Sequence, residues 1–317
     1  MTARPVPVTD APPVATRSLA QQRRSTVKLL FLTLRPEQWT KNLLIFAGVI
    51  FSGRLREAAA VWASLAAFGV FCALSSAVYV FNDVVDRDAD KQHPLKCMRP
   101  IACGELAASV ALIAGVALAA GALIAALLIS PAFAAAAAAY LVLLTLYSTS
   151  LKHVVIVDVL VIAGGFVLRA IAGAVAVDVP ISHWLLVCTT LLALFLALSK
   201  RRHELTLLGD GATVHRRSLE EYSPYLLDQM IAVVTASTLV AYTLYTTDGE
   251  TTTRLGSTKL GLTIPFVLYG IFRYLYLVHQ RRGGGSPANL LVTDRPLLAC
   301  VALWAISVVL ILYFPPG

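Results

Sequence analysis

The chain has 317 residues, of which 58% are hydrophobic and only 14% are charged, and its mean hydropathy is +0.75. Soluble domains carry about 25% charged residues, so this composition indicates a membrane protein and excludes a soluble nucleic-acid-binding protein. The 26 Lys and Arg exceed the 18 Asp and Glu, which gives a net charge of +8. Five cysteines occur without a CxxC pair, so neither a disulfide framework nor a zinc site is expected.

The apolar residues fall into segments long enough to cross a bilayer, which takes roughly 20 residues per helix. The sequence predicts an all-α fold, a polytopic membrane bundle of about nine transmembrane helices, over residues 40–53, 58–81, 107–129, 132–149, 154–177, 184–199, 226–246, 259–279 and 296–314. The first segment is short and the break at Ser130 and Pro131 is tight, so eight helices are the alternative. Residues 1–26 are rich in Pro, Ala, Thr and Arg without the apolar core of a signal peptide, so we expect a disordered cytoplasmic tail before a single transmembrane domain at 27–317.

Lysine and arginine are distributed unevenly among the predicted loops. If the N-terminus is cytoplasmic, only four of the 26 lie on the opposite side and two lie within predicted spans: Arg54, Arg56, Arg254 and Lys259 outside, and Arg169 and Arg273 within. Because positive loops stay on the cytoplasmic side, we expect a multi-pass plasma-membrane protein with a cytoplasmic N-terminus and, after nine spans, an external C-terminus. Alanine-rich spans and the excess of arginine over lysine favour a bacterial source.

An acidic stripe follows the second predicted span. If that helix continues, polar side chains recur on one face: Asn82, Asp83, Asp86 and Asp90. Mg²⁺ prefers oxygen ligands and is held by one or two carboxylates together with substrate phosphates. We therefore predict a magnesium site at these four residues, with a solvated acidic helix end as the alternative.

A basic loop comes directly after the stripe. Pro94 and Pro100 keep it out of a helix, and its positive side chains lie beside the carboxylates in sequence: Lys91, Lys96 and Arg99. Carboxylates, Mg²⁺ and basic side chains together can clamp a diphosphate. The alternative is that these basic residues serve only to orient the chain in the membrane.

The run NDVVDRDAD over residues 82–90 resembles the NDxxDxxxD signature of the UbiA superfamily of intramembrane prenyltransferases. The following HPLKCMRPIACGEL resembles the usual continuation, with Cys97 where many members have a basic residue. The resemblance implies about nine helices around a central cavity that opens to the cytoplasm and laterally to lipid. It also implies a catalytic domain with a cytoplasmic active site, Mg²⁺ as the cofactor, and catalytic roles for Asp83, Asp86 and Asp90.

A second region distinguishes branches of this superfamily. Most aromatic prenyltransferases carry another acidic motif after the sixth helix, where this chain is basic: Lys200, Arg201, Arg202, His203 and Glu204. Together with residues 35–42, 147–152 and 158–169, this segment resembles the branch that transfers 5-phosphoribose to decaprenyl phosphate. Besides the 200–204 cluster, the resemblance implies catalytic roles for Arg99 and Lys152 and substrate contacts by Lys41, Asn42, Asn82, Lys91, Lys96, Arg99, Tyr147, Lys152, Asp158 and Arg169. A lipid-headgroup anchor is the alternative for the cluster.

Arg169 has an argument of its own. It follows Asp158 by eleven residues, so on a helix the two are about 20° apart in azimuth and roughly 16 Å apart along the axis. An arginine inside a span is costly and faces a partner or a water-filled cavity. We expect a substrate phosphate there, with a structural ion pair as the alternative. Arg273 lies near the end of its span, so it can snorkel to the interface.

The reaction implied by the resemblance moves 5-phosphoribose from phosphoribosyl diphosphate to a polyprenyl phosphate, releases diphosphate and makes the lipid-linked precursor of cell-wall arabinose. Phosphoribosyl diphosphate carries more anionic groups than a prenyl diphosphate, which accounts for the additional cations. The acceptor phosphate is already anionic and needs no general base, so catalysis rests on positioning and electrostatic stabilisation.

Two rival functions stay open. The nearest is a UbiA-type aromatic or quinone-precursor prenyltransferase that uses a polyprenyl diphosphate. A membrane transporter fits less well, because its ionisable groups approach the midplane from both sides, whereas here they cluster on one face. The expected partners are the two substrates and membrane lipids, without nucleic acid, and a homo-oligomer is compatible with the sequence.

Overall fold

The computed structural model describes residues 25–93, 96–208, 221–280, 290 and 293–314, and all regular structure within them is helical. Eight helices are long and apolar enough to span a membrane, the seventh counted together with the 3₁₀ helix η7 (Lys259–Thr263) before it. They are α3 (Ala58–Val85), α5 (Ala108–Ile129), α6 (Pro131–Thr149), α7 (Val157–Ala176), α8 (His183–Leu208), α10 (Pro224–Thr247), α12 (Ile264–Gln280) and α14 (Arg295–Tyr313). The predicted all-α membrane fold is confirmed.

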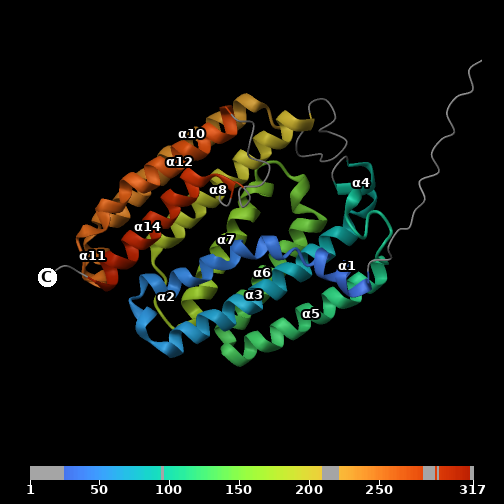
Figure 1. Cartoon of the computed structure of the whole chain (residues 1–317), viewed down its shortest axis with the longest axis horizontal. Coiled ribbons are helices and arrows are strands. Elements are labelled where there is room, and N and C mark those ends of the chain that lie inside the picture. The colour runs from blue at the N-terminus through green and yellow to red at the C-terminus, as the bar shows by residue number, and fades with distance from the viewer. Residues whose placement is uncertain (1–24, 94–95, 209–220, 281–289, 291–292, 315–317) are drawn as a thin grey trace, which may run out of the picture.

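The predicted first span, residues 40–53, is not one continuous α-helix. The chain instead forms α1 (Thr26–Thr33), the 3₁₀ helix η1 (Pro36–Phe46) and α2 (Ala47–Phe51). Pro36 disfavours the α conformation at the residue before it, and Arg35 adopts a left-handed conformation with φ 53°. These three pieces run antiparallel to α3 (Figure 1), from Arg35 beside Asp83 to Phe46 stacked on Phe68, and form an interrupted pass beside the eight long helices.

Of the predicted tail, residues 1–26, the first 24 lie outside the described residues. The last two positions differ from the prediction, because Ser25 caps α1 and Thr26 begins it. The Ser25 hydroxyl accepts a hydrogen bond from the Lys28 N–H at 3.3 Å. Such a cap satisfies a donor that the first helical turn leaves unpaired.

The tight break predicted at Ser130 and Pro131 separates two helices. Ser130 caps α6 by accepting from the Phe133 N–H at 3.0 Å, and Pro131 occupies the first helical position, where its missing N–H costs nothing. Ser223 and Pro224 begin α10 in the same way. A polar cap followed by proline therefore marks the start of two spans.

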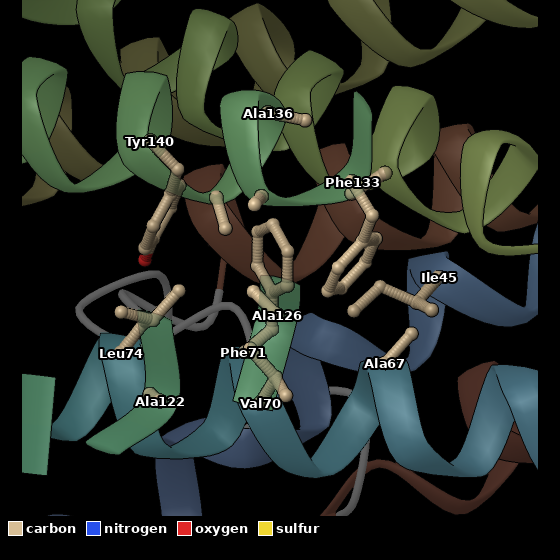
Figure 2. Close-up of a cluster of buried hydrophobic side chains, with 13 residues drawn as sticks. Ile45, Ala67, Val70, Phe71, Leu74, Ala122, Ala126, Phe133, Ala136 and Tyr140 are labelled. Carbon is tan, nitrogen blue, oxygen red and sulfur yellow. The ribbon is translucent and has the colours of Figure 1, made fainter. Parts of the chain in front are cut away.

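The bundle has two halves, with α7 and α8 between them (Figure 1). In one half α3, α5 and α6 pack together, and in the other α10, α12 and α14 lie side by side. An apolar cluster joins the first half through the rings of Phe71, Phe133 and Tyr140 (Figure 2). An apolar groove of about 330 Å³ also lies among these helices, lined by residues such as Phe81, Gly115 and Leu141 of α3, α5 and α6.

Two glycines allow the interrupted pass to approach α7 closely. A Cβ atom on Gly173 would lie 2.1 Å from the Ile45 carbonyl oxygen, and one on Gly48 would lie 2.6 Å from the Gly173 carbonyl oxygen. Small residues permit such backbone contacts between membrane helices. The contact fixes the residues just before Ile45 against α7. Two predicted site residues, Lys41 and Asn42, are among them.

Candidate active site

The acidic residues lie where α3 ends and α4 (Arg87–Gln92) begins. Asp83 and Asp90 are each only 3% exposed, whereas Asn82 and Asp86 are half-buried. The Asn82 amide donates a hydrogen bond to Asp86 at 3.1 Å, as expected for side chains four residues apart on one helical face. Asn82 and Asp86 thus lie together, but the predicted stripe is not on one continuous helix, because α3 ends at Val85 and Asp90 lies in α4.

Three cations surround these carboxylates. Arg99 donates to Asp83 at 3.1 Å and to Asp90 at 2.5 Å, so it bridges the two buried acids. Lys152, in the 3₁₀ helix η4 (Leu151–His153), donates to Asp86. The structure brings together Arg99 and Lys152, which the sequence analysis placed at the site from separate parts of the chain.

Arg35 is a site residue that the sequence analysis did not assign. It donates to Asp83, and its guanidinium lies 5.0 Å from the centre of the Tyr79 ring. Its left-handed backbone conformation is uncommon for a residue with a side chain. Pro36 was the local sequence signal for a break, but the contact with Asp83, 48 residues away, depends on the packing of α1 and η1 against α3.

Lys91 and Lys96 lie in the segment after Asp90. Lys91 pairs with Asp88 at 2.7 Å, on side chains that are 45% and 89% exposed, and this hydrogen bond holds the pKa of Asp88 below its ordinary value. Lys96 begins the 3₁₀ helix η3 (Lys96–Met98), and its backbone N–H donates to His93 at 3.3 Å. Substrate contacts by both lysines stay a prediction.

A second polar group lies deeper, between the interrupted pass, α3, α6 and α7. Arg169 is 5% exposed and donates to Asn42 at 2.7 Å, to the Tyr140 hydroxyl at 2.7 Å and to the Gly165 carbonyl at 2.9 Å. The Asn42 amide donates in turn to Ser75 at 3.2 Å. Arg169 thus has the partners expected of an arginine inside a span, but each of them is neutral.

Asp158 has partners on other helices. It accepts from the Arg201 Nε at 2.8 Å and from the Tyr222 hydroxyl at 2.8 Å, while Arg201 also donates to Glu204 at 2.5 Å and to Tyr147 at 3.1 Å. Asp158 is fully buried and Arg201 is 1% exposed. We call these five residues the buried brace, because they tie α6, α7, α8 and the residues before α10 together.

Arg202 of the 200–204 cluster points away from the buried brace, since successive residues on a helix are about 100° apart. Arg202 donates to Asp228 at 2.5 Å, and His279 lies 3.3 Å from the same carboxylate. Lys200 is 3.9 Å from Glu204, and its side chain is 43% exposed. The cluster is divided between the buried brace and an outer ion pair, and substrate binding by residues 200–204 stays a prediction.

Arg273 pairs with Asp294, at the start of α14. Two hydrogen bonds of 3.1 and 2.8 Å join the guanidinium to the carboxylate, and they hold the pKa of Asp294 below its ordinary value. Asp294 also caps α14 by accepting from the Leu297 N–H at 2.9 Å. Arg273 therefore links the middle of α12 to the start of α14.

Comparison with known proteins assigns the family. The model of the UbiA prenyltransferase family matches residues 43–293, which is more than half of the chain. The chain belongs to the UbiA prenyltransferase family. Among solved structures, this UbiA member is similar to a UbiA homologue from Archaeoglobus fulgidus bound to GPP and Mg²⁺, with a TM-score of 0.67 and 19% identity over 89% of this chain and 99% of that one.

Other relatives are more similar to this chain in sequence than the solved Archaeoglobus fulgidus structure is. The UbiA member is 32% identical to decaprenyl-phosphate phosphoribosyltransferase of Corynebacterium glutamicum, over 89% of this chain and 86% of the relative. It is 33% identical to the protein of the same name in Mycobacterium tuberculosis strain H37Rv, over 87% of this chain and 91% of the relative. It is also 28% identical to nodulation protein NoeC of Azorhizobium caulinodans, over 90% and 95% of the two chains.

The oxygen donors at the acidic end of α3 suit a Mg²⁺ ion that is bound only partly by the protein. Within the described part of this UbiA member, no group of three or more His, Cys, Asp or Glu side chains is arranged to hold a metal ion. Magnesium needs only one or two carboxylates when substrate phosphates and water complete its shell. The oxygen-only set of Asn82, Asp83, Asp86 and Asp90 therefore fits an ion shared with a phosphate substrate better than an all-protein cage.

Proposed function

We propose that this protein transfers 5-phosphoribose from phosphoribosyl diphosphate to a polyprenyl phosphate and releases diphosphate, making a lipid-linked precursor of cell-wall arabinose. One observation carries the proposal: the buried carboxylates of the acidic motif lie among Arg35, Arg99 and Lys152, with Arg169 deeper in the bundle. A substrate with several phosphate groups matches this number of cations. Two relatives that cover most of the chain carry the corresponding name.

The chemistry needs binding and orientation more than acid–base catalysis. The bond between ribose C1 and the diphosphate oxygen breaks, and a bond forms between C1 and an oxygen of the acceptor phosphate. Because that phosphate is already anionic, no side chain has to remove a proton. Arg99 and Lys152 bind the diphosphate and hold C1 towards the acceptor. Buried cations stabilise the negative charge that develops on the departing diphosphate.

Magnesium belongs to the proposal as cofactor. Asn82, Asp83, Asp86 and Asp90 would hold it, and it would neutralise negative charge on the departing diphosphate. Arg99 and Lys152 would bind phosphate oxygens of the same diphosphate. Their present contacts with Asp83, Asp90 and Asp86 keep them oriented towards that position.

The membrane orientation is part of the same proposal. The eight apolar helices make this an integral membrane protein. The acidic motif lies at the end of α3 that contacts Arg35, close to the N-terminal segment. We place that end at the cytoplasmic face of the bacterial plasma membrane, where phosphoribosyl diphosphate is available, and the C-terminus outside.

A purified-protein assay tests the function. Asp86→Asn, which keeps the size of the side chain and removes its charge, should abolish Mg²⁺-dependent formation of lipid-linked phosphoribose from phosphoribosyl diphosphate and decaprenyl phosphate. Asp88→Asn is the matched control, because Asp88 is 89% exposed and faces Lys91. Equal activity of the Asp86 variant and the unmodified protein would overturn the metal and diphosphate assignment.

The same assay separates the nearest rival. The protein is offered either phosphoribosyl diphosphate with decaprenyl phosphate, or a polyprenyl diphosphate with an aromatic acid. The proposal expects diphosphate release only in the first mixture. Release only in the second would identify an aromatic prenyltransferase, which also fits the UbiA fold.

A further inference from the structure

The turn between η4 and α7 has a strained residue at its centre. Ile156, directly before α7, adopts φ 67° and ψ −47°, and the Val157 N–H donates to the Val155 carbonyl across it at 2.7 Å. This is a γ-turn with positive φ at its central residue, a type that is rare and strained. A positive φ is an outlier for a β-branched residue such as isoleucine. The fold therefore holds Ile156 in a conformation that its own side chain disfavours.

The local sequence does not account for this conformation. The Ile156 side chain is 46% exposed, so its burial does not hold the turn in place. No side chain caps the start of α7, whereas Ser130 caps α6 and Ser223 caps α10. The group that holds the turn must come from another part of the chain.

That group is the hydroxyl of Tyr222, a member of the buried brace. The hydroxyl accepts from the Ile156 N–H at 2.7 Å and donates to the Asp158 carboxylate at 2.8 Å, so it bonds the chain at two points two residues apart. The Tyr222 ring is 4% exposed and belongs to an apolar cluster with Leu198 and Leu227. Asp158 is held in turn by the Arg201 Nε at 2.8 Å. One phenol thus fastens the turn to the buried brace.

The turn leads directly back to a cation of the acidic site. The Val154 N–H donates to the Leu151 carbonyl in η4 at 3.2 Å, and the Asp158 N–H donates to the Val154 carbonyl at 3.0 Å. Backbone hydrogen bonds therefore connect η4 to the start of α7 through this turn. Lys152 lies in η4, is 7% exposed and donates to Asp86. The conformation of the turn sets the direction from which η4 presents Lys152.

We infer that Tyr222 is a positioning residue for Lys152. Its hydroxyl holds the γ-turn at Ile156, and the turn holds the Lys152 ammonium beside Asp86. The inference rests on the proposed function, in which Lys152 binds the departing diphosphate. Tyr222 itself contacts the turn and Asp158, so its effect on the reaction passes through Lys152.

Steady-state kinetics tests the inference by rescue. Tyr222→Phe keeps the ring and removes the hydroxyl, so kcat/KM for phosphoribosyl diphosphate should fall about 10-fold, as for the loss of one hydrogen bond. Adding Ile156→Gly should restore most of the loss, because glycine adopts positive φ without a steric penalty. Adding Ile156→Ala should restore less, because alanine keeps its Cβ atom. Tyr225→Phe is the matched control, since Tyr225 is 75% exposed.

The reactivity of Lys152 gives a second readout, which does not require turnover. An amine-reactive ester acylates lysines, and mass spectrometry of the peptides measures the rate at each one. Tyr222→Phe should raise the rate at Lys152 up to about 10-fold, because local opening becomes easier when one hydrogen bond is lost. Ile156→Gly should lower it again in the double variant. Lys41, which is half-buried on the interrupted pass, is the internal reference and should keep its rate.

Three outcomes would overturn the inference. The first is a Tyr222→Phe variant with unchanged kcat/KM and an unchanged acylation rate at Lys152. The second is an equal rise in the rate at Lys41, which would show a general loosening of the bundle. The third is equal rescue by Ile156→Ala and Ile156→Gly, which would assign the effect to the isoleucine side chain. If the unmodified protein makes no lipid-linked phosphoribose, the proposed function fails, and the acylation rates still decide whether Tyr222 positions Lys152.

Discussion

The buried brace and the polar group around Arg169 both place an arginine inside the bundle, but they differ in charge balance. Arg201 is 1% exposed and contacts two carboxylates and a phenol. Arg169 is 5% exposed, and its hydrogen-bond partners among the described residues are all neutral. Burial alone therefore does not identify a ligand site. The charge of the protein partners distinguishes Arg201, which carboxylates neutralise, from Arg169, whose partners in the described part of the chain are neutral.

The largest effect is expected at the buried brace. Arg201→Ala leaves Asp158 buried without its cation, and breaking a buried pair costs about 3–5 kcal/mol. We expect a large loss of unfolding free energy in a detergent denaturation series, with little change in KM for protein that stays folded. Lys200→Ala, on the exposed side of the same helix, is the stability control. If Arg201→Ala were fully stable and its KM for phosphoribosyl diphosphate rose, Arg201 would belong to the substrate site.

The next effect is expected at Arg99, which bridges Asp83 and Asp90. Arg99→Lys keeps the charge but loses the planar fork that reaches two oxygens at once. We expect kcat/KM for phosphoribosyl diphosphate to fall about 100-fold, or about 2.7 kcal/mol, with the protein still folded. Unchanged kinetics would show that Arg99 only neutralises the two carboxylates.

A smaller effect is expected at Tyr79. Tyr79→Phe keeps the ring beneath Arg35 and removes the hydroxyl that accepts from Lys41. One hydrogen bond contributes about 0.5–1.5 kcal/mol. The KM for one of the two substrates, phosphoribosyl diphosphate or decaprenyl phosphate, should therefore rise up to about 10-fold. The same substrate should respond as in Lys41→Gln. A response of the other substrate would show that Tyr79 and Lys41 act on different substrates.

The smallest effect is expected at Lys91. Its pair with Asp88 is exposed, and such pairs contribute about 0–1 kcal/mol. Lys91→Ala should lower the free energy of unfolding by less than about 1 kcal/mol, measured at low and at high salt. A loss of kcat/KM for phosphoribosyl diphosphate as large as that of Arg99→Lys would place Lys91 in the diphosphate site. Exposed and buried cations would then both bind substrate.

Local patterns in the sequence predicted much of the fold. Apolar segments located the eight long helices, and Ser130 followed by Pro131 marked a helix start. Helical spacing alone predicted that Asn82 and Asp86 lie together, and the hydrogen bond between them agrees with that spacing. The interrupted pass could not be predicted in detail, because the 3₁₀ geometry of η1 depends on its packing against α3 and α7.

Contacts between distant parts of the chain were harder to predict. Spacing placed Asp158 and Arg169 on one helical face, yet Asp158 pairs with Arg201 and Arg169 with Asn42, on other elements. The contact between Lys152 and Asp86 joins residues 66 apart, and spacing carried no information about it. Such pairings depend on which helices become neighbours, which a single sequence does not specify.

The central claim concerns the donor and the lipid product. The most direct measurement uses membranes that contain this chain, labelled phosphoribosyl diphosphate and decaprenyl phosphate, with and without Mg²⁺. The account predicts a labelled lipid that forms with Mg²⁺ in the unmodified protein and the Asp88→Asn control, and is absent in Asp86→Asn. A lipid fraction without label in the unmodified protein, or equal labelling in Asp86→Asn, would contradict it.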